Sequence, residues 1–256
     1  TCLVNSEKGG SGGRFTVVVA DGVSESGLRP LLDDARFKVV SVADKVALEA
    51  ALPTADALIV RSATKVTREL LEQAPNLRVV GRAGVGVDNI DLGVATEFGI
   101  PVINAPEGNT VSAAELAMAL ILTVARNISW ADASVRGGAW ARSQFSGIEL
   151  RGRTLGLIGA GRIGTEVALR AQAFGMETIA YDPYLTEERA KDLGIEQVEL
   201  DDVIARGDVI SLHVPLTPQT EGMIGEAQLK AMKSTAILVN AARGGVVEED
   251  ALVAAL

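Results

Sequence analysis

Residues 154–164 read TLGLIGAGRIG, and this stretch decides the fold of the second half of the chain. A short apolar run leads into Gly-x-Gly-x-x-Gly, and a helical pattern follows. Gly159 permits the tight turn from strand to helix, Gly161 lets a pyrophosphate approach the backbone, and Gly164 lets the helix pack closely on the sheet. The start of that helix offers N–H groups and the positive end of its dipole to the phosphates. The stretch therefore predicts a dinucleotide-binding strand, loop and helix.

An acidic residue strengthens this prediction. Residues 177–182 form a second predicted strand that ends in Asp182, about 20 residues beyond the glycines, where a carboxylate that binds a ribose 2′-hydroxyl is expected. A 2′-phosphate would meet like charge there, and no arginine directly follows the acid. The pattern therefore favours NAD over NADP. The alternative is a glycine-rich turn that binds no ligand.

The composition narrows the function. The 256 residues carry 24 Lys+Arg against 33 Asp+Glu, a net charge of -9, which argues against a nucleic-acid or anionic-membrane surface but not against an anionic small molecule. The single cysteine, Cys2, excludes an internal disulfide framework and favours a reducing compartment: the cytoplasm, or an organelle stroma or matrix. No apolar run reaches membrane-spanning length, and the glycine-rich residues 1–13 predict a flexible leader.

Strand and helix patterns alternate along both halves of the chain. Short β-branched runs lie at residues 15–20, 38–42, 56–60, 77–80, 101–104, 197–200, 208–212 and 236–240, and helical patterns separate the first five at 26–34, 45–52, 68–73 and 92–98. Such alternation predicts βαβ units and parallel sheets. We expect two doubly wound α/β domains, residues 14–107 and 108–256, with a ligand cleft between them. The similarity of the halves indicates related domains, or only the general likeness of βαβ units.

A long helix is predicted at residues 110–126, with Asn109 or Thr110 as its N-cap. It is apolar around most of its circumference, which is typical of a helix buried in a core or in a subunit interface. Residues 129–147, with Trp130 and Trp140, predict a protruding arm. Helix and arm together predict a homodimer or homotetramer.

Several stretches together resemble one enzyme family. They are VRSATKVT (60–67), GRAGVGVDN (81–89), NAP (104–106), LIGAGRIG (157–164), YDPY (181–184), LHVPLT (212–217) and NAARGG (240–245). The chain resembles the D-isomer-specific 2-hydroxyacid dehydrogenases, and the first two stretches point to the branch that acts on 3-phosphoglycerate. The resemblance implies a flavodoxin-like substrate-binding domain over 14–107 and a Rossmann NAD-binding domain over 108–256. It also implies hydride transfer between C2 of 3-phosphoglycerate and the nicotinamide of NAD, which gives 3-phosphohydroxypyruvate and opens serine synthesis.

The resemblance implies roles for individual residues. Arg243 grips the carboxylate and the C2 oxygen as a catalytic residue, and the N–H groups of Val85 and Gly86 bind the carboxylate. The implied substrate-binding residues are Arg61, Ser62, Arg82, Val85, Gly86, Asn109 and Arg142. Arg61, together with Arg82 and Lys65, matches positions that face the phosphate, and Arg142 is expected to reach the phosphate site of the neighbouring subunit. The implied cofactor-binding residues are Gly159, Gly161, Arg162, Ile163, Gly164, Asp182, Pro183, His213, Val214, Pro215, Thr220, Ala241 and Arg243, and no metal is implied. For the arginines the alternative is a salt bridge or a solvated surface cation, and for Gly84 and Gly86 it is turn geometry alone.

The chain departs from the family pattern in one respect. The family's proton carrier is a histidine backed by a glutamate, and the resemblance implies that both lie beyond Leu256. The one histidine here, His213, matches a cofactor contact instead. We therefore expect a C-terminally truncated form of a longer enzyme. Alternative functions are an NAD-sensing, corepressor-like binding protein and a D-lactate, glyoxylate or formate dehydrogenase.

Overall fold

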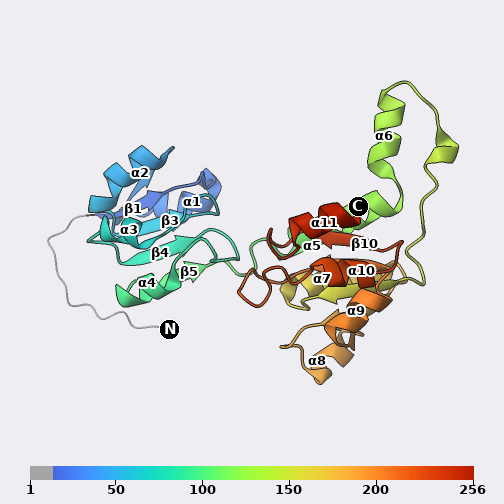
Figure 1. Ribbon diagram of the computed structural model, residues 1–256. Coiled ribbons are helices and arrows are strands. Elements are labelled where there is room, and N and C mark those ends of the chain that lie inside the picture. Colours follow the sequence, from blue (N-terminus) through green and yellow to red (C-terminus); the bar gives the residue numbers. More distant parts are fainter. Residues whose placement is uncertain (1–13) are drawn as a thin grey trace. The chain divides into compact units, whose positions relative to one another are not determined.

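The computed structural model describes residues 14–256 and divides them into two compact units, one ending at Gly108 and the other running from Asn109 to Leu256 (Figure 1). Each unit contains one five-stranded parallel sheet with helices between the strands. The two doubly wound α/β domains predicted from the sequence are thereby confirmed as a fold class. The predicted leader, residues 1–13, lies outside the described residues.

The first unit is a flavodoxin-like sheet. Its elements are β1 (Phe15–Val19), α1 (Glu25–Leu32), β2 (Phe37–Ser41), α2 (Lys45–Ala51), the 3₁₀ helix η1 (Leu52–Thr54), β3 (Ala57–Val60), α3 (Arg68–Glu72), β4 (Val79–Arg82), α4 (Leu92–Glu97) and β5 (Val102–Asn104). The strand order is β2-β1-β3-β4-β5, the flavodoxin order. Leu28 of α1 packs on one face of the sheet, and Leu48, Leu71 and Val94 of α2, α3 and α4 pack on the other.

One predicted strand of this unit is displaced. Residues 77–80 were expected as a strand, but β4 begins only at Val79. The backbone N–H of Leu77 donates to the carbonyl of Ala74, so Leu77 belongs to the turn that follows α3. Its side chain is buried all the same, in the core cluster that also contains Leu71 and Val80. Burial of an apolar side chain is thus not evidence of a strand here.

The second unit has the Rossmann strand order. After α5 (Thr110–Ala125), α6 (Ile128–Arg136) and the 3₁₀ helix η2 (Arg142–Gln144) come β6 (Thr154–Ile158), α7 (Arg162–Ala173), β7 (Glu177–Tyr181), α8 (Glu187–Asp192), β8 (Glu196–Gln197), α9 (Leu200–Arg206), β9 (Val209–Leu212), α10 (Glu226–Ala231), β10 (Ile237–Asn240) and α11 (Glu249–Ala255). The order β10-β9-β6-β7-β8 places β6, which carries the glycine-rich loop, at the centre. The strand predicted at 197–200 is wrong beyond Gln197, because Leu200 begins α9.

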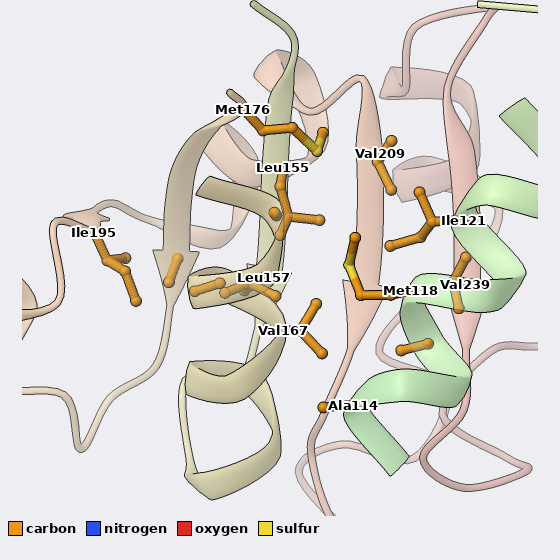
Figure 2. Close-up of a cluster of buried hydrophobic side chains, with 14 of the residues drawn as sticks. Ala114, Met118, Ile121, Leu155, Leu157, Val167, Met176, Ile195, Val209 and Val239 are labelled. Carbon is orange, nitrogen blue, oxygen red and sulfur yellow. The ribbon is translucent and has the colours of Figure 1, made fainter. Parts of the chain in front are cut away.

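The helix predicted at 110–126 is buried on one face only. Ala114, Met118 and Ile121 of α5 belong to one buried cluster with Leu155 and Val209 of the sheet and Val167 of α7 (Figure 2). Small alanines on this face let the helix approach α7 and the strands closely. Leu116, Leu120 and Val124, each four residues apart, form an exposed apolar stripe on the opposite side.

The predicted arm is visible in the second unit, where α6 and the segment after it stand away from the sheet (Figure 1). Trp130 and Trp140 are both largely exposed on it. Within residues 14–256, no single helix is long and apolar enough to cross a membrane, and α5 with α6 meets that test only as a pair bent by 67°.

Candidate functional site

The register of the second sheet brings the predicted cofactor residues to one edge. Ile158 of β6 lies opposite Tyr181 of β7 and Leu212 of β9, and Leu212 lies opposite Asn240 of β10. The residues that directly follow these four strand ends are Gly159, Asp182, His213 and Ala241. Because all the strands are parallel, these residues share the carboxyl edge, where open α/β sheets bind their ligands.

Glycine occupies the three positions of the loop for different structural reasons. Gly159 has a φ of +94°, and a Cβ on it would lie 2.7 Å from the carbonyl oxygen of His213. A Cβ on Gly164 would overlap the carbonyl oxygen of Gly159. Gly161, in contrast, has a φ of -68°, and a Cβ there would meet nothing within 4 Å. The fold itself requires Gly159 and Gly164, whereas the open space at Gly161 fits a ligand that approaches the backbone closely.

The start of α7 can receive the phosphates. Gly161 is its N-cap residue and supplies no side-chain hydrogen bond to the first turn. The amides of the first turn, with the positive end of the helix dipole, therefore face the side where Gly161 leaves space. The residues present thus fit the pyrophosphate of a dinucleotide.

Asp182 ties the glycine-rich loop to the end of β7. Its Oδ2 accepts a 2.8 Å hydrogen bond from the backbone N–H of Ala160, and its Oδ1 accepts one of 2.8 Å from the N–H of Tyr184. A carboxylate has about four lone-pair positions, so acceptor capacity remains for a ribose hydroxyl. Asp182 can therefore shape the loop and bind the ribose at the same time.

An acidic cavity of about 700 Å³ adjoins Asp182. Glu187, Glu199 and Asp202 line it, together with Glu196, which pairs with Arg206 at 2.7 Å. Arg206 is the only cation among its lining residues. A 2′-phosphate placed there would meet a surplus of negative charge, so the surroundings favour a dinucleotide without that phosphate.

His213 is held as a neutral ring. Its Nε2 lies 2.9 Å from the hydroxyl of Ser211, which is fully buried in β9. Burial lowers the pKa of His213 to about 4. The ring is therefore uncharged at neutral pH and a weak base. Thr220, also predicted at the cofactor, donates to the carbonyl of Pro215 at 2.6 Å and shapes the turn after β9.

Arg243 sits on a turn shaped by the last residue of β10. The side-chain amide of Asn240 donates to the carbonyl of Arg243 at 2.8 Å, and its Oδ1 accepts from the N–H of Ala242 at 3.1 Å. The guanidinium donates through Nη1 to the carbonyl of Ala242 at 2.8 Å. A cation thus lies directly after the carboxyl end of β10, in the same edge as the glycine-rich loop.

In the first unit, the loop after β4 presents backbone N–H groups. The N–H of Ala105 donates to the carbonyl of Gly84 at 3.0 Å, and the side-chain amide of Asn104 donates to the carbonyl of Val85 at 2.6 Å. The C=O and N–H of a trans peptide point in opposite directions, so the N–H groups of Val85 and Gly86 point away from β5. Neither donates to another group within residues 14–256. Two adjacent amides that point the same way can bind an anion, and we call this pair the nest.

Arg61 and Ser62 follow β3 at the same edge, since Val60 lies opposite Arg82 in the register. Both side chains are exposed. The Arg82 guanidinium occupies the space where a Cβ on Gly84 would lie, so Arg82 packs against the start of the nest. The first unit therefore offers one exposed cation and, on the neighbouring loop, a pair of amides.

Two predicted substrate residues belong to the second unit. Asn109 is the N-cap residue of α5, with no side-chain bond to the helix, and Arg142 lies in η2 on the arm. Their roles toward the substrate remain predictions. Residues 14–256 contain no group of three or more His, Cys, Asp or Glu side chains that could hold a metal ion.

Sequence reasoning missed three residues that shape the first unit's edge. They are Asp21, Asn89 and Asn104, whose side chains bond to the backbone of the loops after β3 and β4. Two of them carried a usable signal, because Asp21 follows β1 closely and Asn104 ends β5. A polar residue at the carboxyl end of a parallel strand is a candidate for such a role.

Comparison with known proteins places this geometry in a family. A family model described as "D-isomer specific 2-hydroxyacid dehydrogenase, NAD binding domain" matches residues 118–256. The chain is 50% identical over 241 residues to D-3-phosphoglycerate dehydrogenase of Methanocaldococcus jannaschii, covering 94% of this chain and 46% of that protein. It is 51% identical over 236 residues to the enzyme of the same name from Mycobacterium leprae, covering 92% and 45%. The chain thus spans about half the length of these relatives.

The chain covers a larger share of a similar solved structure. D-lactate dehydrogenase from Aquifex aeolicus, complexed with NAD and lactic acid, is 35% identical with a TM-score of 0.84, covering 93% of this chain and 72% of that one. Three observations point to the same family: the glycine-rich loop, the acid at the end of β7, and the family match over the whole of β6 to α11. The chain belongs to the D-isomer-specific 2-hydroxyacid dehydrogenase family.

Proposed function

We propose that the protein oxidises 3-phospho-D-glycerate at C2 with NAD, giving 3-phosphohydroxypyruvate as the first step of serine synthesis. Relatives that are 50% and 51% identical carry the name D-3-phosphoglycerate dehydrogenase. The second unit matches the family's NAD-binding domain. The acid surplus around Asp182 supports NAD over NADP.

The observation that carries the choice of substrate is the charge pattern of the first unit. Arg61, an exposed cation, and the adjacent amides of Val85 and Gly86, which have no acceptor within residues 14–256, lie on neighbouring loops of one sheet edge. A ligand with two anionic ends suits this arrangement. The phosphate of 3-phosphoglycerate would bind Arg61 and Ser62, and its carboxylate would bind the nest.

The residues of the second unit support the reaction itself. NAD supplies the acceptor for the hydride that leaves C2. The start of α7 and Asp182 would hold the dinucleotide, with Pro183, Val214 and Pro215 beside it at the sheet edge. The Arg243 guanidinium would bind the C2 oxygen and stabilise the charge that develops on it. His213 would contact the cofactor and would not act as the catalytic base. A neutral ring with a pKa near 4 does not take up the hydroxyl proton at neutral pH.

A comparison of two ligands tests the substrate. The chain, saturated with NADH, is titrated calorimetrically with 3-phosphoglycerate and with D-glycerate, which lacks the phosphate. We expect 3-phosphoglycerate to bind at least about tenfold more tightly, since a charge-assisted contact to phosphate contributes roughly 1.5–3 kcal/mol. Arg61→Met should remove most of that difference.

Other outcomes identify the alternatives. Equal affinity for both acids, unchanged by Arg61→Met, would favour a dehydrogenase of smaller 2-hydroxyacids such as lactate. NADH binding with no affinity for either acid would favour an NAD-sensing binding protein.

We also propose that the protein is a homodimer or homotetramer that works in a reducing compartment. The exposed apolar stripe of α5 and the tryptophans of the arm support the first part. The single cysteine supports the second.

A further inference from the structure

Asp21, which follows β1, bonds to the loop that carries Arg61. Its Oδ2 accepts from the backbone N–H of Arg61 at 2.8 Å and from the N–H of Thr64 at 3.0 Å. Its Oδ1 accepts from the Thr64 hydroxyl at 2.7 Å. One carboxylate thus receives three hydrogen bonds from residues 61–64, which follow the neighbouring strand β3.

Asn89 bonds to the carbonyl groups of the same two loop residues. Its Nδ2 donates to the carbonyl of Arg61 at 2.7 Å and to the carbonyl of Thr64 at 2.6 Å. Asp21 takes the N–H groups of Arg61 and Thr64, and Asn89 takes their C=O groups. Both backbone polar groups of both residues are therefore satisfied by side chains from outside the loop. We call Asp21 and Asn89 together the loop clamp.

The conformation of Asp21 shows that this contact is maintained against a cost. Its φ is +65°, and among the described residues only Asn127 is another non-glycine with positive φ. A non-glycine residue in this region is strained by roughly 1–2 kcal/mol and persists where its surroundings hold it. Burial raises the pKa of Asp21, but hydrogen bonds from Thr64 and Arg61 and the Arg61 charge lower it by more, so the net pKa lies below its ordinary value.

The clamp also leaves the guanidinium of Arg61 available. The three donors on Asp21 come from backbone N–H groups and a hydroxyl, and Arg61 forms no ion pair within residues 14–256. The side chains of Arg61 and Ser62 stay exposed while the backbone of Arg61 and Thr64, on either side of Ser62, is held. Preorganisation of this kind reduces the entropy lost when a ligand binds.

We propose that Asp21 and Asn89 are positioning residues that hold the loop of Arg61 and Ser62 in the geometry that binds the substrate's phosphate. This inference rests on the proposed function for the substrate, but the clamp itself is a property of the first unit. Neither residue would touch the substrate itself. Both act through the backbone of the loop.

Two conservative variants and a matched control test the proposal. Asp21→Asn keeps the size of the side chain and the tolerance of positive φ but removes the negative charge, so the bonds from the N–H groups of Arg61 and Thr64 are no longer charge-assisted. Asn89→Asp keeps size but places a carboxylate against two carbonyls. The control is Asp56→Asn, because Oδ2 of Asp56 accepts from the N–H of Thr16 at 2.8 Å at the opposite, amino-terminal edge of the same sheet.

Binding and hydrogen exchange are measured for each variant. We expect the Kd for 3-phosphoglycerate, in the presence of NADH, to rise roughly tenfold or more in Asp21→Asn and Asn89→Asp, the size of effect of one or two charge-assisted hydrogen bonds. The Kd for NADH alone should stay within about twofold in all variants, because NADH binds the second unit. The amides of Arg61 and Thr64 should exchange at least about tenfold faster in Asp21→Asn, while that of Val18 in β1 stays protected.

Three results would overturn the inference. A loss of 3-phosphoglycerate binding in Asp56→Asn as large as that in Asp21→Asn would show a general effect of sheet stability. Loop amides that exchange at the unaltered rate in Asp21→Asn would show that no clamp exists. Normal 3-phosphoglycerate affinity with a loosened loop would separate the clamp from substrate binding. If the unaltered chain does not bind 3-phosphoglycerate at all, the proposed function fails, and the exchange measurement still decides whether the clamp exists.

Discussion

The carboxylate of Asp182 accepts a 2.8 Å hydrogen bond from the backbone N–H of Ala160, inside the glycine-rich loop. Asp182 therefore acts on the phosphate-binding loop as well as on the ribose. Asp182→Ala should raise the Kd for NADH by roughly 10- to 100-fold, because it removes both the ribose contact and a charge-assisted bond to the loop.

NADPH should respond differently to the same substitution. Its 2′-phosphate is repelled by Asp182, so the relief of repulsion offsets the loss of the loop contact. We expect the preference for NADH over NADPH to fall by about tenfold or more, measured by fluorescence titration of both cofactors. Equal losses for the two dinucleotides would contradict a role for Asp182 at the ribose.

The glycines of the loop provide a matched pair of substitutions. Gly161→Ala adds a Cβ into open space at a φ of -68°, so the free energy of unfolding should change by less than about 0.5 kcal/mol. Gly164→Ala places a Cβ onto the carbonyl oxygen of Gly159 and should destabilise the chain by about 1–3 kcal/mol.

The two variants should also differ in how their affinity for NADH relates to their stability. Gly161→Ala should weaken NADH at least about tenfold at unchanged stability, since the added methyl occupies the space for the pyrophosphate. Thermal unfolding with and without NADH reads both quantities in one experiment. If Gly161→Ala bound NADH with unchanged affinity, the loop would not be part of the cofactor site.

The sequence predicts strand ends well and contacts between them poorly. Gly159, Asp182 and His213 could be placed at one edge because apolar runs mark where parallel strands end. The bond from Ala160 to Asp182 could not be foreseen, because it depends on how two loops pack once the sheet has formed. The same holds for Asp21, whose bonds join the loop after β1 to the loop after β3.

Errors in the predicted strands have the same origin. Val198 and Leu200 have the apolar character of a strand, yet Glu199, Asp201 and Asp202 favour the start of a helix, and α9 forms there. At residues 198–202 the acidic side chains, which favour a helix start, therefore outweigh the apolar residues, which favour a strand. The apolar pattern of α5 likewise did not reveal which face the core would cover.

The exposed stripe of α5 predicts self-association. Leu116, Leu120 and Val124 are 54%, 38% and 48% exposed, and apolar side chains that line one exposed helix face favour a protein–protein contact there. Leu116→Glu combined with Val124→Glu should convert a dimer or tetramer into a monomer at micromolar concentration, as measured by light scattering after gel filtration. The control is Leu169→Glu on α7, where the leucine is 46% exposed outside the stripe, and it should leave the mass unchanged. A monomeric unaltered chain would refute the prediction.

His213 should make stability fall as the solution is acidified. Its pKa is about 4 in the folded chain and about 6.5 when unfolded, so between these values the unfolded state binds one proton more. The free energy of unfolding should therefore decrease as pH falls from 6.5 toward 4, by at most about 3 kcal/mol in total. The carboxylates with lowered pKa, Asp21 and Asp208 among them, lose their contribution only at lower pH, as the pH falls through their folded pKa values.

His213→Gln isolates this contribution. Glutamine can keep the hydrogen bond to Ser211 but does not titrate, so its unfolding free energy should be nearly flat between pH 6.5 and 4.5 and should fall below that range as in the unaltered chain. Denaturant unfolding at a series of pH values gives both curves. Parallel curves would show that His213 is not held neutral. The same low pKa makes His213 a poor base at neutral pH, so if the chain oxidised 3-phosphoglycerate at an ordinary rate and His213→Gln abolished that activity, the assignment of His213 to the cofactor side would be wrong.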